Sequence, residues 1–171
     1  MKNLAKIANN TKLVTYLSIL AIIALGSYFS LAFRGLDMKT LLDTTFNFSA
    51  THLHSVLSGY GATLRGHYLV AEMIDLVVMI FVCFVQSLII FKAFHRMRWG
   101  KQLHLIPLIA AVLNGLKDIA MVAILTQFPK ESVGLANVTN ALNIAKTIFV
   151  DASFGLILVA VAILVVRRIR K

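Results

Sequence analysis

The sequence predicts an all-α integral membrane protein: a four-helix bundle with a short amphipathic surface helix between the first two spans. Composition points to this class, because 59% of the 171 residues are hydrophobic and only 14% are charged. Soluble domains are about 45–50% apolar and about 25% charged. A chain of this size buries only about 70% of its unfolded surface on folding, so the excess of apolar side chains is expected to face lipid.

Four long apolar segments divide the chain. They cover about residues 13–33, 69–91, 105–126 and 134–166. A membrane-spanning helix needs about 20 mostly apolar residues at about 1.5 Å of rise each. The first three segments fit this length, and the fourth is long enough to tilt or to extend beyond the surface. None alternates like a barrel strand, so we predict four helices in a single membrane domain over residues 1–171.

The first apolar segment has a second reading as a signal peptide. A basic leader precedes it, and Ser30-Leu31-Ala32 has small residues at the two positions that signal peptidase requires. Its apolar region is about 20 residues long, however, whereas that of a signal peptide is about 7–15. We therefore predict a true span.

Basic residues are concentrated in three segments. They are Lys2, Lys6 and Lys12 before the first span, Lys92, Arg96, Arg98 and Lys101 after the second, and Arg167, Arg168, Arg170 and Lys171 at the end. The other two loops are nearly neutral. The positive-inside rule places all three basic segments, and so both termini, in the cytoplasm. We expect a bacterial inner membrane, with these residues contacting anionic lipid headgroups.

The net charge of +10 therefore indicates topology. Binding to nucleic acid would need a basic face with stacking aromatic side chains on a folded soluble domain, and the sequence predicts no such domain. Nucleic acid is thus not expected as a partner.

The loop at residues 34–67 is the largest segment outside the predicted spans. We expect Thr51 to cap a helix whose apolar residues form one stripe. The stripe consists of Leu53, Val56, Leu57, Tyr60 and Leu64. The pattern predicts a short amphipathic helix on the outer surface that leads through Gly66 into the second span, although Gly59 and Gly61 count against it.

Charged and amide side chains interrupt three of the predicted spans. A charge at bilayer depth costs about 2.5–3.5 kcal/mol on insertion scales, so such groups face the bundle interior and find partners. The candidate ligand-binding residues are Glu72, Asp75, Asn114, Lys117, Asp118, Asn143, Lys146 and Asp151. The helical rise places them in the outer half of the membrane. On the fourth span, helical spacing predicts one face that carries Asn140, Asn143, Thr147 and Asp151.

Two interpretations of these residues stay open. In the first they only hold the helices together, with Lys117 paired with Asp75 or Asp151 and at least one carboxylate of the second or fourth span within its reach. Lys146 would then pair with Glu72. Such contacts are common and are worth only about 0.6 kcal/mol each on average. In the second they line a polar pocket, because four carboxylates against two lysines exceed what helix pairing requires.

The function that follows is the binding or passage of a small polar or lipid ligand, or a scaffold for a partner membrane protein or a second copy. The alternative is a lipid-modifying enzyme in which Asp75, Asp118 and Asp151 supply the acid and the base. The sequence contains no nucleophile motif, phosphate-binding loop or dinucleotide-binding motif, which favours a function other than catalysis.

Neither a metal nor a cofactor is expected. His52, His54, His67 and Glu72 fall on one side of the membrane, but their spacing matches no zinc signature, so solvated surface histidines are the better interpretation. The single cysteine, Cys83, excludes a multi-cysteine site. All five histidines lie outside the spans or at their edges, whereas axial haem ligands would be expected inside them.

Two stretches carry a family resemblance. They are residues 68–75 (YLVAEMID) and 106–118 (IPLIAAVLNGLKD), followed by Phe128-Pro129 and a fourth span with a polar start. Their order resembles small four-span bacterial membrane proteins of unassigned function, over about residues 50–150. This resemblance implies the topology and no activity.

A further resemblance is to the four-helix sterol isomerase and sigma-2 receptor superfamily, which places acidic groups in a membrane pocket. Glu72, Asp75, Asp118 and Asp151 would correspond to those groups in outline. This chain lacks a pocket histidine, and Lys117 departs from the pattern. No catalytic role is transferred on this resemblance.

Overall fold

The computed structural model describes residues 2–32, 42, 45–95, 97 and 99–170. In this part of the chain all regular elements are helical, and four helices are long and apolar enough to cross a membrane. They are α2 (Thr11–Ala32), α4 (Gly61–Phe94), α5 (Leu105–Gln127) and α6 (Val133–Ile169). The predicted all-α membrane bundle is confirmed. Of the basic residues assigned to the loops and the tail, Arg96, Arg98 and Lys171 lie outside the described residues.

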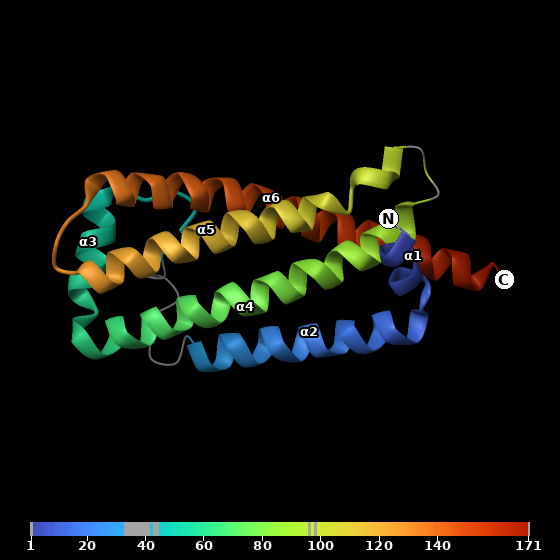
Figure 1. Ribbon diagram of the computed structural model, residues 1–171, viewed down its shortest axis with the longest axis horizontal. Helices are drawn as coiled ribbons and strands as arrows, with labels where there is room; N and C mark the ends of the chain where they lie inside the picture. The colour runs from blue at the N-terminus through green and yellow to red at the C-terminus, as the bar shows by residue number, and fades with distance from the viewer. Residues whose placement is uncertain (1, 33–41, 43–44, 96, 98, 171) are drawn as a thin grey trace.

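The four long helices lie roughly side by side, with α4 between α2 and α5, and with α6 packed mainly on α5 (Figure 1). Both termini lie at one end of the bundle, which we call the terminal end. The short helix α3 (Ala50–Gly59) lies at the other, the α3 end. A bundle with an even number of spans places its two termini on the same side, as here.

The junction between α3 and α4 departs from its prediction. The N-cap of α3 is Ser49, whose Oγ accepts a hydrogen bond from the backbone N–H of His52 (3.1 Å), so the expected cap at Thr51 is wrong. Gly61 turns the chain into α4 with φ = +64°, a left-handed conformation that glycine adopts without strain. The span therefore begins at Gly61, and Gly66 lies within it rather than before it.

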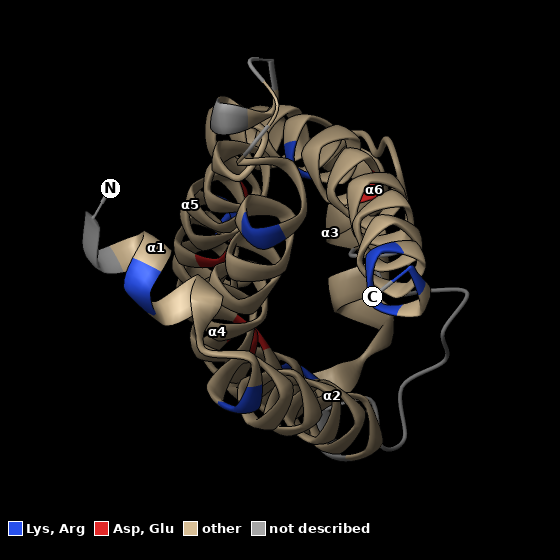
Figure 2. Cartoon of the chain, turned by 90° about the vertical axis from the view of Figure 1, so that its right-hand side faces the viewer, with Lys and Arg blue, Asp and Glu red and all other residues tan. Residues whose placement is uncertain are grey.

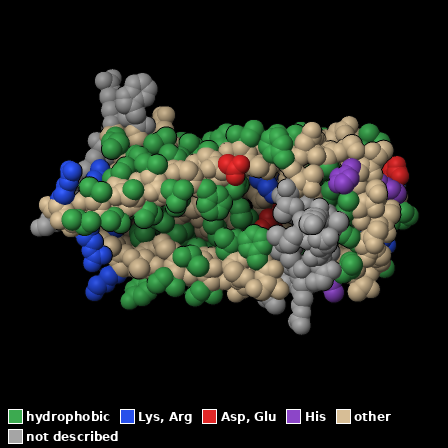
Figure 3. Space-filling view, turned by 180° about the vertical axis from the view of Figure 1, so that it is seen from behind, with side chains coloured by type: hydrophobic (Ala, Val, Ile, Leu, Met, Phe, Trp, Pro, Cys, Tyr) green, Lys and Arg blue, Asp and Glu red, His purple; other side chains and the backbone are tan. Residues whose placement is uncertain are grey.

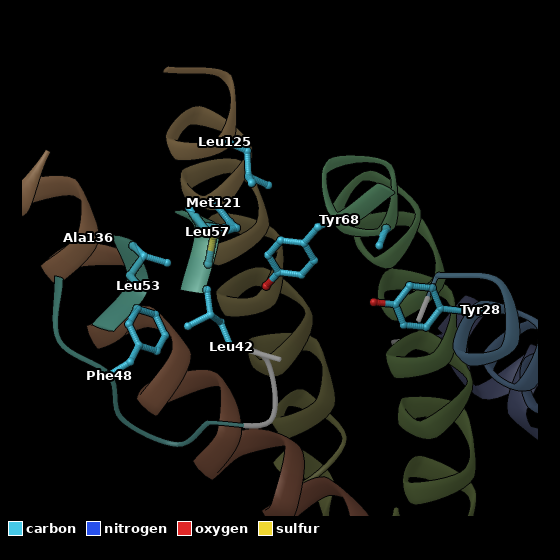
Figure 4. Packing of buried hydrophobic residues seen from close by; sticks show 10 residues of the cluster. Tyr28, Leu42, Phe48, Leu53, Leu57, Tyr68, Met121, Leu125 and Ala136 are labelled. Carbon is cyan, nitrogen blue, oxygen red and sulfur yellow. The ribbon is translucent and has the colours of Figure 1, made fainter. Parts of the chain in front are cut away.

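The core at the α3 end is apolar and draws on every long helix (Figure 4). Leu53 and Leu57 of α3 are 2% and 1% exposed, and the opposite face of α3 is exposed, so this helix is amphipathic as predicted. The buried residues that they join include Tyr28 of α2, Tyr68 of α4, Met121 of α5 and Ala136 of α6. Burial of a leucine side chain contributes about 1.5–3 kcal/mol, so α3 is held firmly across the end of the bundle.

The terminal end contains a short helix that the apolar runs did not predict. Helix α1 (Lys2–Asn9) packs Leu4, Ile7 and Ala8 against Leu88 and Phe91 of α4. Asn10 then caps α2 by accepting a hydrogen bond at Oδ1 from the backbone N–H of Leu13 (3.1 Å). This end is therefore anchored to α4 before the first span begins.

Candidate functional site

Charged and amide side chains meet between α4 and α5 in the interior of the bundle. This polar cluster consists of Glu72, Asp75, Asn114, Lys117 and Asp118. The Nζ atom of Lys117 lies 2.9 Å from Oε2 of Glu72 and 2.8 Å from Oδ1 of Asp118. All three side chains are 1% exposed. The carboxylate expected near Lys117 from the second or fourth span is thus present, and it is Glu72.

Asn114 joins the two remaining carboxylates. Its Nδ2 donates one hydrogen bond to Oδ2 of Asp75 (2.8 Å) and another to Oδ2 of Asp118 (2.7 Å). The opposite amide orientation would place Oδ1 against two carboxylate oxygens, which also only accept. The orientation is therefore fixed, and no described residue donates a hydrogen bond to the buried Oδ1 atom.

Helical spacing explains why these side chains meet. Positions three and four residues apart share a helix face, and Glu72 and Asp75 are related in this way on α4, as are Asn114 and Lys117 on α5. The two faces approach closely at Gly115, where an added Cβ would lie 3.0 Å from Cδ1 of Leu76. Residues with short side chains at such crossings let membrane helices come close enough for polar contacts.

The other predicted site residues of α6 have different surroundings. Asn143 donates from Nδ2 to the backbone carbonyl of Thr45 (2.8 Å). One turn away, Nδ2 of Asn140 donates to Oδ1 of Asn47 (2.8 Å), and its Oδ1 accepts from the backbone N–H of Phe48 (2.9 Å). These amides hold the segment 45–48 against α6. They form an anchor for the loop, which sequence reasoning did not foresee.

Asp151 does not join the cluster, because its side chain is exposed. The buried face of α6 repeats every seven residues, at Thr139, Lys146, Ser153 and Ala160. Residues spaced four apart move gradually around a helix. Asp151 therefore lies on a different side of α6 from Asn143, which precedes it by eight residues. The predicted common face of α6 is wrong at this position.

The pairing of charges also differs from that expected. Glu72 was expected opposite Lys146, and the structure pairs it with Lys117. Lys146 is nevertheless buried, at 9% exposure. Among the residues of the polar cluster, Asp75 is the most exposed, at 7%.

Among the described residues, no helix lies between α2 and α6 on one side of the bundle (Figure 2). Helices α2, α4, α5 and α6 form an arc, with α2 and α6 at its two ends (Figure 2). The face between α2 and α6 is hollowed along the middle of the bundle, with hydrophobic side chains on its walls and acidic and basic side chains within it and on its rim (Figure 3). We call this hollow the lateral groove.

A second constellation, at the α3 end, was missed in the sequence. His54 of α3 stacks on Phe128 with ring centroids 5.3 Å apart, and its Nδ1 lies 3.2 Å from Oε1 of Glu131. The guanidinium of Arg65 lies 4.2 Å from the centroid of the same Phe128 ring and donates to the carbonyl of Leu57 (3.0 Å). In the described part of the chain, no group of three or more His, Cys, Asp and Glu residues is placed to hold a metal ion.

Compared with models of known protein families, with curated proteins and with solved structures, the chain matches none. The class that the fold defines is a polytopic α-helical membrane protein. Both family resemblances of the sequence stay predictions.

Proposed function

We propose that this membrane protein binds an amphipathic molecule in the lateral groove, with the polar head of the ligand at the polar cluster and its chain along α2 and α6. The observation that carries the proposal is the hollowed face of the bundle, where charged side chains lie inside an apolar opening (Figure 3). A site of this kind suits a molecule with one polar end and one apolar end.

The unmet hydrogen-bonding capacity of the interior favours a head that donates hydrogen bonds. In the polar cluster, no described residue donates a hydrogen bond to the buried Oδ1 atom of Asn114. Buried polar atoms in proteins nearly always have a partner, so such atoms call for donors. Hydroxyl and amine heads provide donors, whereas an ionised carboxylate head does not.

The proposed route into the groove is sideways from the bilayer. At the α3 end, the segment 45–48 is bound to α6 through Asn140 and Asn143. The positive-inside rule supports a cytoplasmic location for the terminal end, because Lys6, Lys12 and the arginines of the tail gather there. The head of the ligand would then lie in the outer half of the membrane.

Photochemical labelling tests this proposal. The purified chain is placed in phosphatidylcholine vesicles with octadecanol that carries a diazirine in its chain, and the labelled peptides are identified by mass spectrometry. Labels are expected on α2 and α6. A second groove, of about 780 Å³, lies between α4 and α5 and is lined by apolar side chains including Val77, Ile80 and Leu116. Labels confined to those side chains would contradict the proposal.

Competition with unlabelled compounds of the same chain length tests the head. Octadecanol and octadecylamine should displace the label, and stearate should not. The isosteric Asp75→Asn should weaken competition by octadecylamine roughly tenfold, equivalent to about 1.4 kcal/mol. Glu131→Gln, at an exposed position of the α3 end, is the matched control and should leave competition unchanged.

A lipid-modifying enzyme is the second candidate. The observation that favours it is the bridge from Asn114 to both Asp75 and Asp118, since carboxylates held together by one amide can act as an acid and a base. Under this function the hydroxyl group of octadecanol would take an acyl group from phosphatidylcholine, so that an octadecyl ester and lysophosphatidylcholine would be recovered from the vesicles. Under the binding function the octadecanol would be recovered unchanged.

A further inference from the structure

We infer that the outer face of α6 binds a membrane helix of another protein that carries a lysine or arginine within its span, and that Asp151 is the contact for this basic side chain. This inference does not rest on the ligand proposed for the lateral groove.

Asp151 is in an unusual environment for a carboxylate. It is residue 19 of the 37 in α6, and so the central residue of the helix, and its side chain is exposed. Its exposed apolar neighbours along α6 include Ile148, Phe154 and Leu158, which are 56%, 50% and 73% exposed. The described residues give it no ion pair and no side-chain hydrogen bond. Ionisable residues within a span are rarely left facing hydrocarbon, because they pair with one another or line a polar cavity.

The face of α6 around Asp151 is exposed and leaves room for a second helix. Of the four spans, α6 is the least buried: 11% of its most apolar stretch is buried, against 44% for α4. Ile148, Asp151, Gly155 and Leu158 follow one another at intervals of three, four and three residues, which places them on one face. An added Cβ at Gly155 would meet no atom within 4 Å, so a second helix can approach closely beside the carboxylate.

The charges identify the occupant as a basic helix from a different protein. A symmetric pair of α6 helices would set Asp151 against the Asp151 of the second copy, and like charges in contact are unfavourable. Among the described residues of a second copy, the lysines within the spans, Lys117 and Lys146, are only 1% and 9% exposed, so neither is presented to the carboxylate. A lysine or arginine on another span would instead pair with the carboxylate in a medium of low dielectric constant.

Synthetic membrane helices provide the test. The full-length chain, labelled at its C-terminus, is reconstituted in phosphatidylcholine vesicles with labelled leucine-alanine helices of about 23 residues that carry lysine, leucine or aspartate at the centre. Association is measured by energy transfer. A central position makes the depth of the test residue the same for both orientations of the peptide.

We expect the lysine helix to associate roughly tenfold more tightly than the leucine helix, and the aspartate helix no more tightly than the leucine helix. Asp151→Asn should abolish the preference for lysine, and Gly155→Leu should weaken association with both peptides. Equal association of the three peptides with the unmodified chain would overturn the inference, as would a lysine preference that survives Asp151→Asn. Energy transfer between two copies of the chain, without binding of the lysine helix, would also overturn it and would identify a second copy as the occupant.

Discussion

Lys117 and Glu72 form an ion pair across α4 and α5, with Nζ and Oε2 2.9 Å apart and each side chain 1% exposed. Two charges so far from water are stable only together, because removal of one leaves the other buried without compensation. Asp118 shares the ammonium group at 2.8 Å, so α5 supplies both a cation and an anion to the same contact.

The first prediction concerns this pair. Lys117→Met should lower the free energy of unfolding by about 3–5 kcal/mol, because Glu72 and Asp118 lose their buried cation. Adding Glu72→Gln to that variant should restore part of the loss, since one stranded charge is removed. Thermal melting in detergent measures both effects. Lys6→Met, at an exposed site of α1, should change stability by no more than about 0.5 kcal/mol. Equal melting of Lys117→Met and the parent would contradict the assigned pair.

The spans were predictable because only helices and closed barrels satisfy their backbone hydrogen bonds inside a bilayer. The predicted segments 13–33 and 105–126 match α2 (Thr11–Ala32) and α5 (Leu105–Gln127) closely. The second span begins eight residues before its predicted start, because Gly61 rather than Gly66 makes the turn from α3. Hydropathy marks the part of a helix that lies in lipid, and it does not mark the polar turns by which the helix extends beyond it.

The residues of the polar cluster were predictable from the sequence, but the pairs that they form were not. Charges within apolar runs must face the interior, so the meeting of Glu72 and Lys117 inside the bundle followed from their location in the spans. Depths taken from the midpoints of apolar runs did not bring Glu72 to the level of Lys117, because α4 extends further than its apolar run. The outward position of Asp151 depended on the seven-residue repeat of α6, which becomes evident only once the buried side of that helix is known.

The second prediction concerns Asn114. Asn114→Leu removes the donor that Asp75 and Asp118 share, and hydrogen bonds to charged groups contribute about 1.5–3 kcal/mol each. We therefore expect the free energy of unfolding to fall by at least about 1.5–3 kcal/mol, the contribution of one such bond. Chemical unfolding in detergent micelles measures it. The control is Asn137→Leu, an exposed asparagine of α6, which should leave stability nearly unchanged. A loss no larger than that of the control would show that the carboxylates do not depend on this amide.

The third prediction concerns Arg65. Its guanidinium lies on the Phe128 ring and donates to the carbonyl of Leu57, so it connects α3 to the loop before α6. Arg65→Lys keeps the charge but loses the planar group that stacks on the ring. A loss of about 1 kcal/mol should speed amide hydrogen exchange in α3 roughly fivefold. Arg168→Lys, near the end of α6, is the matched control and should leave exchange in α3 unchanged. Equal exchange in the two variants would show that the stacking does not hold α3.

The last prediction concerns orientation in the membrane. The two termini share one end of the bundle, and the basic loop before α5 lies at the same end (Figure 1). Because basic loops are retained in the cytoplasm, a reporter that is active only in the cytoplasm should be active when fused after residue 171 and silent when inserted within residues 40–60. Insertion at η2 (Trp99–Gln102) is the positive control and should match the C-terminal fusion, since both positions are at the terminal end. Activity at residues 40–60, with silence at the other two positions, would reverse the orientation and place the polar cluster in the cytoplasmic half. Activity at only one of the two terminal-end positions would contradict the four-span topology itself.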